Sequence, residues 1–161
     1  MYKRILVAVD GSQPGYSAGM TSYELAQALQ READVFTRRG EVTARLSISG
    51  LLDDLSMSQR IAVLRIVQEA LSNVRAHSGA SNVEISLRAT EDGLDLRVAD
   101  DGNGFDLPAT ASAAARRGRL GIVGMNERIR LLGGVFSIES VPGSGTTISA
   151  AIPAWRPLAG S

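Results

Sequence analysis

Hydrophobic side chains recur with a helical period in several segments of the chain. In the first, apolar residues spaced by four, four and three positions predict an amphipathic helix that ends at Gly40. In the second, apolar residues share one face of a long helix that begins with Ser58 as its N-cap and runs through His77. A further helix is predicted over about residues 122–132, before two glycines. The apolar positions of the first two helices are Leu25, Leu29, Ala33 and Phe36, and Leu64, Val67, Leu71 and Val74.

Other segments alternate apolar and polar residues, which is the period of a strand with one buried face. These segments are residues 42–49, 83–87, 94–98, 135–140 and 145–152. Short turns join the second to the third and the fourth to the fifth, so they predict two antiparallel hairpins. The order of elements predicts an α+β fold in which an antiparallel or mixed sheet is covered on one face by helices. These elements do not account for the other face of the sheet. A partner and the N-terminal segment are the two candidates to cover it.

The two ends of the chain differ in composition from its middle. Residues 1–10 are a short apolar run that predicts a strand entering a turn, and residues 13–22 are rich in Gly, Ser and Pro, as linkers are. We therefore expect an N-terminal strand and linker over residues 1–21, one folded domain over residues 22–153, and a flexible tail over residues 154–161.

Composition narrows the functional classes. The 161 residues carry 17 basic and 17 acidic side chains, no cysteine and a single histidine, His77. This excludes a disulfide framework, a cysteine nucleophile and a histidine-rich metal cluster. Zero net charge and 4% aromatic content argue against nucleic-acid binding. No apolar run is long enough to cross a bilayer and no signal peptide is visible, so we expect a cytoplasmic chain without membrane contact.

Two polar clusters could carry chemistry. Glu69, Asn73 and His77 are spaced i, i+4 and i+8, which puts them in a row on one helix face. A carboxylate there can orient or deprotonate an attacking group, and an amide oxygen can ligate Mg²⁺ without adding charge. At the end of a predicted strand, Asp100 can accept a hydrogen bond from an exocyclic amine, in a run that includes Asp101, Gly102 and Gly104. A solvated helix face and an ordinary turn explain the same residues.

A third cluster surrounds the start of the helix at about residue 122. Gly118, Gly121 and Gly124 offer free backbone amides near the positive end of a helix dipole, and arginines flank the first of them. Such a junction suits phosphate binding. A flexible loop with a solvated basic run is the alternative.

Taken in order, these motifs resemble the ATP-binding domain of bacterial sensor histidine kinases, in the subgroup related to nitrate and desaturase-type sensors. The similarity covers about residues 22–153. The motifs are Glu69-Ala70-Leu71-Ser72-Asn73 with His77, Val98 to Phe105, Gly121 to Arg128, Leu132-Gly133-Gly134, and Gly143-Ser144-Gly145-Thr146.

The resemblance implies a Bergerat-type ATP-binding fold, an α/β sandwich, with ATP and Mg²⁺ as cofactors. Glu69 corresponds to the activating carboxylate, Asn73 to the Mg²⁺ ligand, and His77 lies near the phosphates. Asp100 corresponds to the residue that binds the adenine amino group, with Thr146 reaching adenine through water. Gly102 and Gly104 correspond to residues that shape the pocket. Residues 105–121 correspond to the lid over ATP, and Gly118, Gly121 and Gly124 to the residues that bring backbone amides to the phosphates.

The resemblance also implies partners and leaves alternatives open. The γ-phosphate would pass to a histidine on a separate phosphoacceptor (dimerisation) domain and from there to a response regulator, because nothing before residue 58 contains a histidine. Ala76 stands where many relatives carry a basic residue. An anti-sigma-type serine kinase and a non-catalytic ATP-sensing interaction module are the other interpretations. Residues 1–12 resemble the opening strand of universal stress proteins, and a simple strand and turn fits them equally well.

Overall fold

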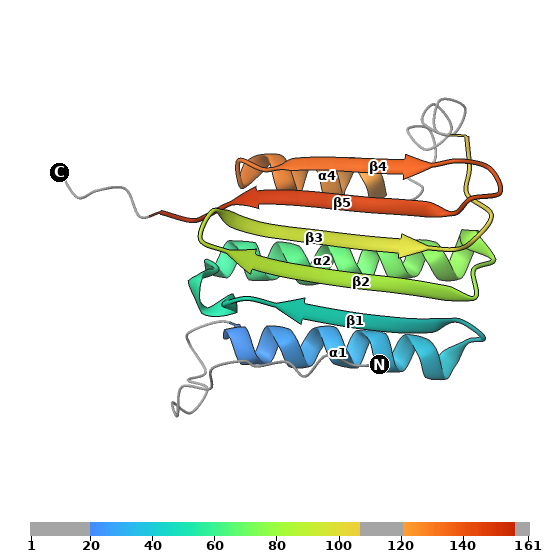
Figure 1. Ribbon diagram of the computed structural model, residues 1–161, viewed down its shortest axis with the longest axis horizontal. Coiled ribbons are helices and arrows are strands. Elements are labelled where there is room, and N and C mark those ends of the chain that lie inside the picture. Colours follow the sequence, from blue (N-terminus) through green and yellow to red (C-terminus); the bar gives the residue numbers. More distant parts are fainter. Residues whose placement is uncertain (1–19, 107–120, 157–161) are drawn as a thin grey trace.

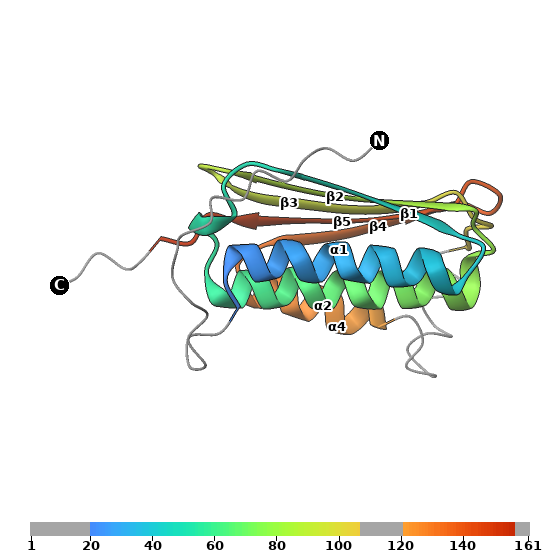
Figure 2. The same cartoon turned by 90° about the horizontal axis from the view of Figure 1, so that it is seen from below.

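The chain folds into a sheet with a layer of helices on one face (Figures 1 and 2). The computed structural model describes residues 20–106 and 121–156. Its sheet has five strands in the order β1-β2-β3-β5-β4. The strands are β1 (Thr43–Ser49), β2 (Asn82–Thr90), β3 (Gly93–Asp100), β4 (Val135–Ser140) and β5 (Thr146–Pro153). The helices are α1 (Ser22–Arg39), α2 (Met57–Asn73) and α4 (Ile122–Leu131), with a 3₁₀ turn at Leu52–Asp54 and a π-helical turn at Val74–Ser78.

The predicted α+β fold with helices on one face is confirmed. Three predicted parts of the chain lie outside the described residues. They are the strand at residues 1–10, most of the 105–121 lid including Gly118, and the last residues of the tail. Strands β2 and β3, and likewise β4 and β5, are antiparallel hairpins as expected. Strand β1 pairs with β2 in parallel. The sheet is therefore mixed, because α2 crosses between these two strands and returns the chain in the same direction.

The start of α2 differs from the prediction. The predicted N-cap, Ser58, lies inside the first turn, and the N-cap is Ser56. The Ser56 hydroxyl accepts a hydrogen bond from the backbone N–H of Gln59 at 3.2 Å, and the Gln59 side-chain oxygen accepts one from the Ser56 N–H at 2.9 Å. Ser56 is favoured because its partner three residues later returns the hydrogen bond. Gln59 also donates to the Pro153 carbonyl at 2.8 Å, which ties α2 to the end of β5.

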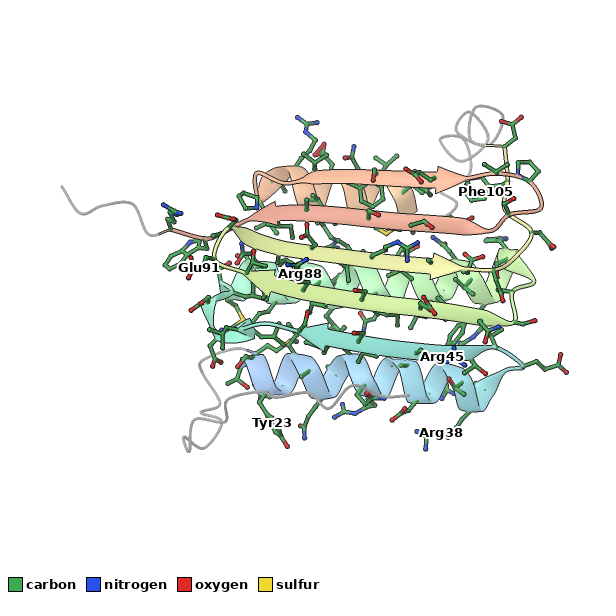
Figure 3. The ribbon with its side chains drawn as sticks, in the orientation of Figure 1. Tyr23, Arg38, Arg45, Arg88, Glu91 and Phe105 are labelled. Carbon is green, nitrogen blue, oxygen red and sulfur yellow. The ribbon has the colours of Figure 1, made fainter. Side chains whose placement is uncertain are left out.

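The core lies between the sheet and the helices, and the opposite sheet face is polar. Fully buried side chains include Leu29, Ile66, Val67, Ile85 and Leu96. On the other face, exposed Arg45 stands opposite Glu84, and Arg88 opposite Asp95. Figure 3 shows Arg45 and Arg88 on the strands of that open face. Charged side chains in opposite pairs suit contact with water, so this face needs no covering layer. Among the described helices, none has the length and apolar character needed to cross a membrane.

Candidate nucleotide site

A cavity opens at the end of the sheet where β3 ends and β5 begins, next to the end of α2 and the start of α4. The site residues predicted from sequence that line it are Asn73, His77, Asp100 and Thr146. Its remaining walls are mainly apolar and come from α2, the π-helical turn, α4, three strands and a loop: Ala70, Val74, Val98, Phe105, Ile122, Ile138 and Ile148. The cavity therefore combines an apolar slot with a few polar groups, which is typical of a small-molecule site.

Of the three polar residues spaced by four positions, Glu69, Asn73 and His77, the last two line this cavity. Asn73 is the last residue of α2, and His77 follows in the π-helical turn. The Ser78 hydroxyl donates to the Val74 carbonyl at 2.8 Å and accepts from the Ala80 N–H at 3.0 Å. These bonds stabilise the helix end. A π-helical turn inside or at the end of a helix is often found at functional sites.

Asp100 ends β3 and lines the cavity. Its Oδ1 accepts a hydrogen bond from the Gly102 N–H at 2.8 Å. Burial raises the pKa of Asp100, the backbone N–H groups of Gly102 and Thr146 partly offset this effect, and the charge of Asp101 adds to it. A partly desolvated carboxylate with fixed backbone donors is a strong and well-oriented acceptor for a ligand N–H group.

Two glycines after Asp100 let the chain pass close to neighbouring backbone. A Cβ on Gly102 would lie 2.3 Å from the Ser78 carbonyl oxygen. Gly104 has a φ of +62°, and a Cβ there would lie 2.1 Å from the Val141 carbonyl oxygen. A side chain at either position would push the turn out of place, so glycine is required here for close packing.

Glu69, on α2, is not among the residues that line the cavity, and its side chain lies beside the start of α4. A Cβ on Gly121, whose φ is +58°, would lie 2.3 Å from Glu69 Oε1. Gly121 is the N-cap residue of α4. The structure thus places the Glu69 carboxylate against the first turn of α4. Gly124 lies in that same helix with open space around it.

The sequence prediction missed two serines that organise the site. Ser140, at the end of β4, accepts a hydrogen bond from the Phe105 N–H at 2.9 Å, and its hydroxyl lies 2.7 Å from the Thr146 hydroxyl. Figure 3 shows Phe105 beside this end of β4. Ser78 accepts the Asn103 N–H at its carbonyl oxygen at 2.6 Å. Single serines carry no spacing signal, so only their tertiary neighbours reveal them.

Comparisons with known proteins agree with this geometry. Residues 58–156 match the family described as histidine kinase-, DNA gyrase B-, and HSP90-like ATPase. The DegS signal transduction histidine-protein kinase/phosphatase of Brevibacillus brevis is 39% identical over 93 residues, which cover 58% of this chain and 23% of that protein. The sensor histidine kinase LiaS of Bacillus subtilis is 34% identical over 131 residues, or 80% of this chain and 34% of LiaS. The chain thus spans no more than about a third of these relatives.

A solved structure shares the fold. The ATP-binding domain of PrrB from Mycobacterium tuberculosis superposes with a TM-score of 0.64 at 22% identity, covering 81% of this chain and 93% of that one. The matched family segment contains α2 except its first residue, the whole cavity and α4. On this evidence the chain belongs to the family of histidine kinase-, DNA gyrase B- and HSP90-like ATPases, and the relatives that it resembles in sequence are histidine kinases.

Proposed function

We propose that the chain binds Mg-ATP in this cavity and donates the γ-phosphate to a histidine on a separate phosphoacceptor domain. The observation that carries the proposal is the convergence of Asn73, His77, Asp100 and Thr146 on one apolar cavity. A planar apolar base and a charged triphosphate need such a combination. We assign this role to a domain spanning residues 22–153.

Adenine recognition is assigned to the inner end of the cavity. The base lies among aliphatic walls, and its exocyclic amino group donates to the Asp100 carboxylate. Hydrogen bonds from Gly102 and Thr146 hold that carboxylate, so it is oriented before the ligand arrives. Thr146 reaches the base through a water molecule.

The triphosphate is assigned to the outer end, towards Asn73, His77 and the start of α4. The residues that the structure describes contain no group of three His, Asp or Glu side chains able to hold a metal. This fits Mg²⁺, which usually takes one or two protein oxygens together with substrate phosphates and waters. The Asn73 side-chain oxygen supplies a neutral ligand, and bound Mg²⁺ would offset charge on the transferred phosphate. Backbone amides at Gly118, Gly121 and Gly124 serve the phosphates.

The acceptor approaches beside Glu69, which orients the attacking histidine. Since Glu69 lies against Gly121, the phosphoacceptor domain docks over the first turn of α4. Val123 is 71% exposed there, and Leu131 on the same helix is 84% exposed. Exposed apolar side chains on one helix favour a protein contact. Catalysis then rests on positioning and electrostatics, as in other phosphoryl transfers.

Calorimetry with Mg-ATP tests binding, and Asn73→Ala tests the metal ligand. We expect the variant to lose at least about tenfold in affinity for Mg-ATP. Asn126→Ala, an exposed asparagine on α4, is the matched control and retains wild-type affinity. Absence of wild-type binding at millimolar Mg-ATP would refute the proposal.

Phosphotransfer is tested by adding γ-labelled ATP and a phosphoacceptor helix pair from a related kinase. Label on a histidine of that fragment supports a histidine kinase domain. ATP binding without label on any added acceptor favours a nucleotide-sensing module, and phosphoserine on an anti-anti-sigma partner favours the serine-kinase alternative. We further propose that the phosphate continues to a response regulator and that the chain works in the cytoplasm, where ATP is available.

A further inference from the structure

We propose that Asp101 is a positioning residue for base recognition, which anchors the Asp100 turn to the start of β2. The inference rests on the proposed ATP binding. Asp101 is exposed and is not among the residues that line the cavity. It therefore acts through Asp100 and touches no nucleotide.

Three hydrogen bonds converge on the Asp101 carboxylate. Oδ1 accepts the backbone N–H of Ser81 at 2.8 Å and that of Asn82 at 2.9 Å. Oδ2 accepts the Asn82 side-chain amide at 2.9 Å. The Asp101 N–H also donates to the Asn82 carbonyl at 3.2 Å. Both carboxylate oxygens are engaged, so the side chain holds one orientation.

These bonds also favour the ionised form of Asp101. The Asn82 side-chain amide, followed by the Asn82 and Ser81 backbone N–H groups, lowers the pKa of Asp101 below its ordinary value. The group is ionised at neutral pH, and hydrogen bonds to an ionised acceptor are stronger than neutral ones. An exposed residue thereby holds a firm connection between two loops.

The anchored loops carry both ends of the proposed site. Directly before Asp101, Asp100 receives the Gly102 N–H. Two residues after Asp101, Asn103 donates to the Ser78 carbonyl at the end of the helix that carries Asn73. The turn is therefore held on one side by Ser81 and Asn82 and on the other by Ser78. Loss of the first attachment lets Asp100 rotate, while the core beneath β3 stays intact.

Base selectivity separates this role from a purely structural one. We expect Asp101→Ala to weaken ATP binding about tenfold and GTP binding much less, because adenine carries an amino group at C6, where guanine has a carbonyl oxygen that cannot donate to Asp100. A merely destabilised protein would lose both nucleotides in proportion. Asp95→Ala replaces an exposed aspartate on β3, the strand that ends directly before Asp101; it is the matched control and keeps the wild-type ratio.

An exchange of the two side chains provides a rescue test. Asn82→Asp places two carboxylates at the 2.9 Å contact and weakens ATP binding at least about fivefold by like-charge repulsion. Combining it with Asp101→Asn restores binding to within about twofold, because the amide and carboxylate have exchanged roles across the same contact.

Calorimetric titrations of ATP and GTP into these variants decide the question. An unchanged ATP-to-GTP ratio in Asp101→Ala, or a double variant no better than Asn82→Asp, overturns the inference while the ATP site stands. A wild-type chain that binds no ATP overturns the proposed function, and this inference with it.

Discussion

Replacing Gly102 by alanine tests whether close backbone packing builds the adenine end of the site. The new Cβ would lie 2.3 Å from the Ser78 carbonyl oxygen, whereas ordinary contact begins at 3.4 Å, so the two segments must separate by about 1 Å. That movement strains the Asn103 to Ser78 hydrogen bond of 2.6 Å and the Gly102 to Asp100 hydrogen bond of 2.8 Å.

At about 1 kcal/mol for each hydrogen bond, plus overpacking, the expected loss of unfolding free energy is about 2–4 kcal/mol. The midpoint temperature of thermal unfolding should fall by about 5–15 °C. The affinity for ATP, measured by calorimetry at a temperature where the variant is folded, should drop at least about tenfold, because Asp100 loses its orienting donor.

Gly40→Ala is the matched control for Gly102→Ala. Gly40 follows α1 with extended backbone, and a Cβ there would meet only the Phe36 carbonyl oxygen and the Val42 backbone nitrogen, each at an ordinary distance of 3.9 Å. Gly40 is not among the residues that line the cavity, so this substitution should change the unfolding free energy by no more than about 0.5 kcal/mol and leave ATP affinity unchanged. Gly102→Ala with wild-type unfolding temperature and ATP affinity would show that the packing argument is wrong.

Three further predictions concern acidity, catalysis and docking. The pKa of folded Asp100 is raised, and only its ionised form accepts the amino group. As the pH is lowered, ATP affinity should therefore begin to fall at a higher pH than that at which an ordinary aspartate takes up its proton; Asp100→Asn should abolish this part of the pH profile. Glu69→Gln removes the charge of the carboxylate that lies against Gly121, so phosphotransfer should fall about 100-fold with little change in the dissociation constant for ATP; equal losses in both would contradict the role of Glu69. Val123→Asp should lower transfer to an added phosphoacceptor domain about tenfold and leave ATP binding intact; transfer at the wild-type rate would place docking elsewhere.

Local sequence patterns predicted most elements of the described fold. The spacing of Leu25, Leu29, Ala33 and Phe36 predicted α1, and alternation predicted both hairpins, because these signals depend on neighbours along the chain. The prediction of Ser58 as the N-cap of α2 was wrong, although the sequence contains the pattern that marks the correct residue. Ser56 followed three residues later by Gln59 is a capping-box pattern, and it outweighs the serine two residues further on, Ser58.

The site was predicted in its residue types and only partly in its arrangement. The order of the motifs around Asn73, Asp100 and Thr146 indicated a nucleotide site, and the structure brings these three to one cavity. Ser140 gave no signal, because its role comes from Phe105 and Thr146, which lie far from it or across a turn.

By itself, then, the sequence determined the helices, the hairpins and the ATP-binding family, since each rests on short-range periodicity or on ordered local motifs. The tertiary structure alone decided the parallel pairing of β1 with β2, the contact of Glu69 with Gly121, and the attachment of Asp101 to Ser81 and Asn82. These contacts join segments separated by tens of residues. Local preference says nothing about such pairs, and packing of the helices on the sheet brings them together.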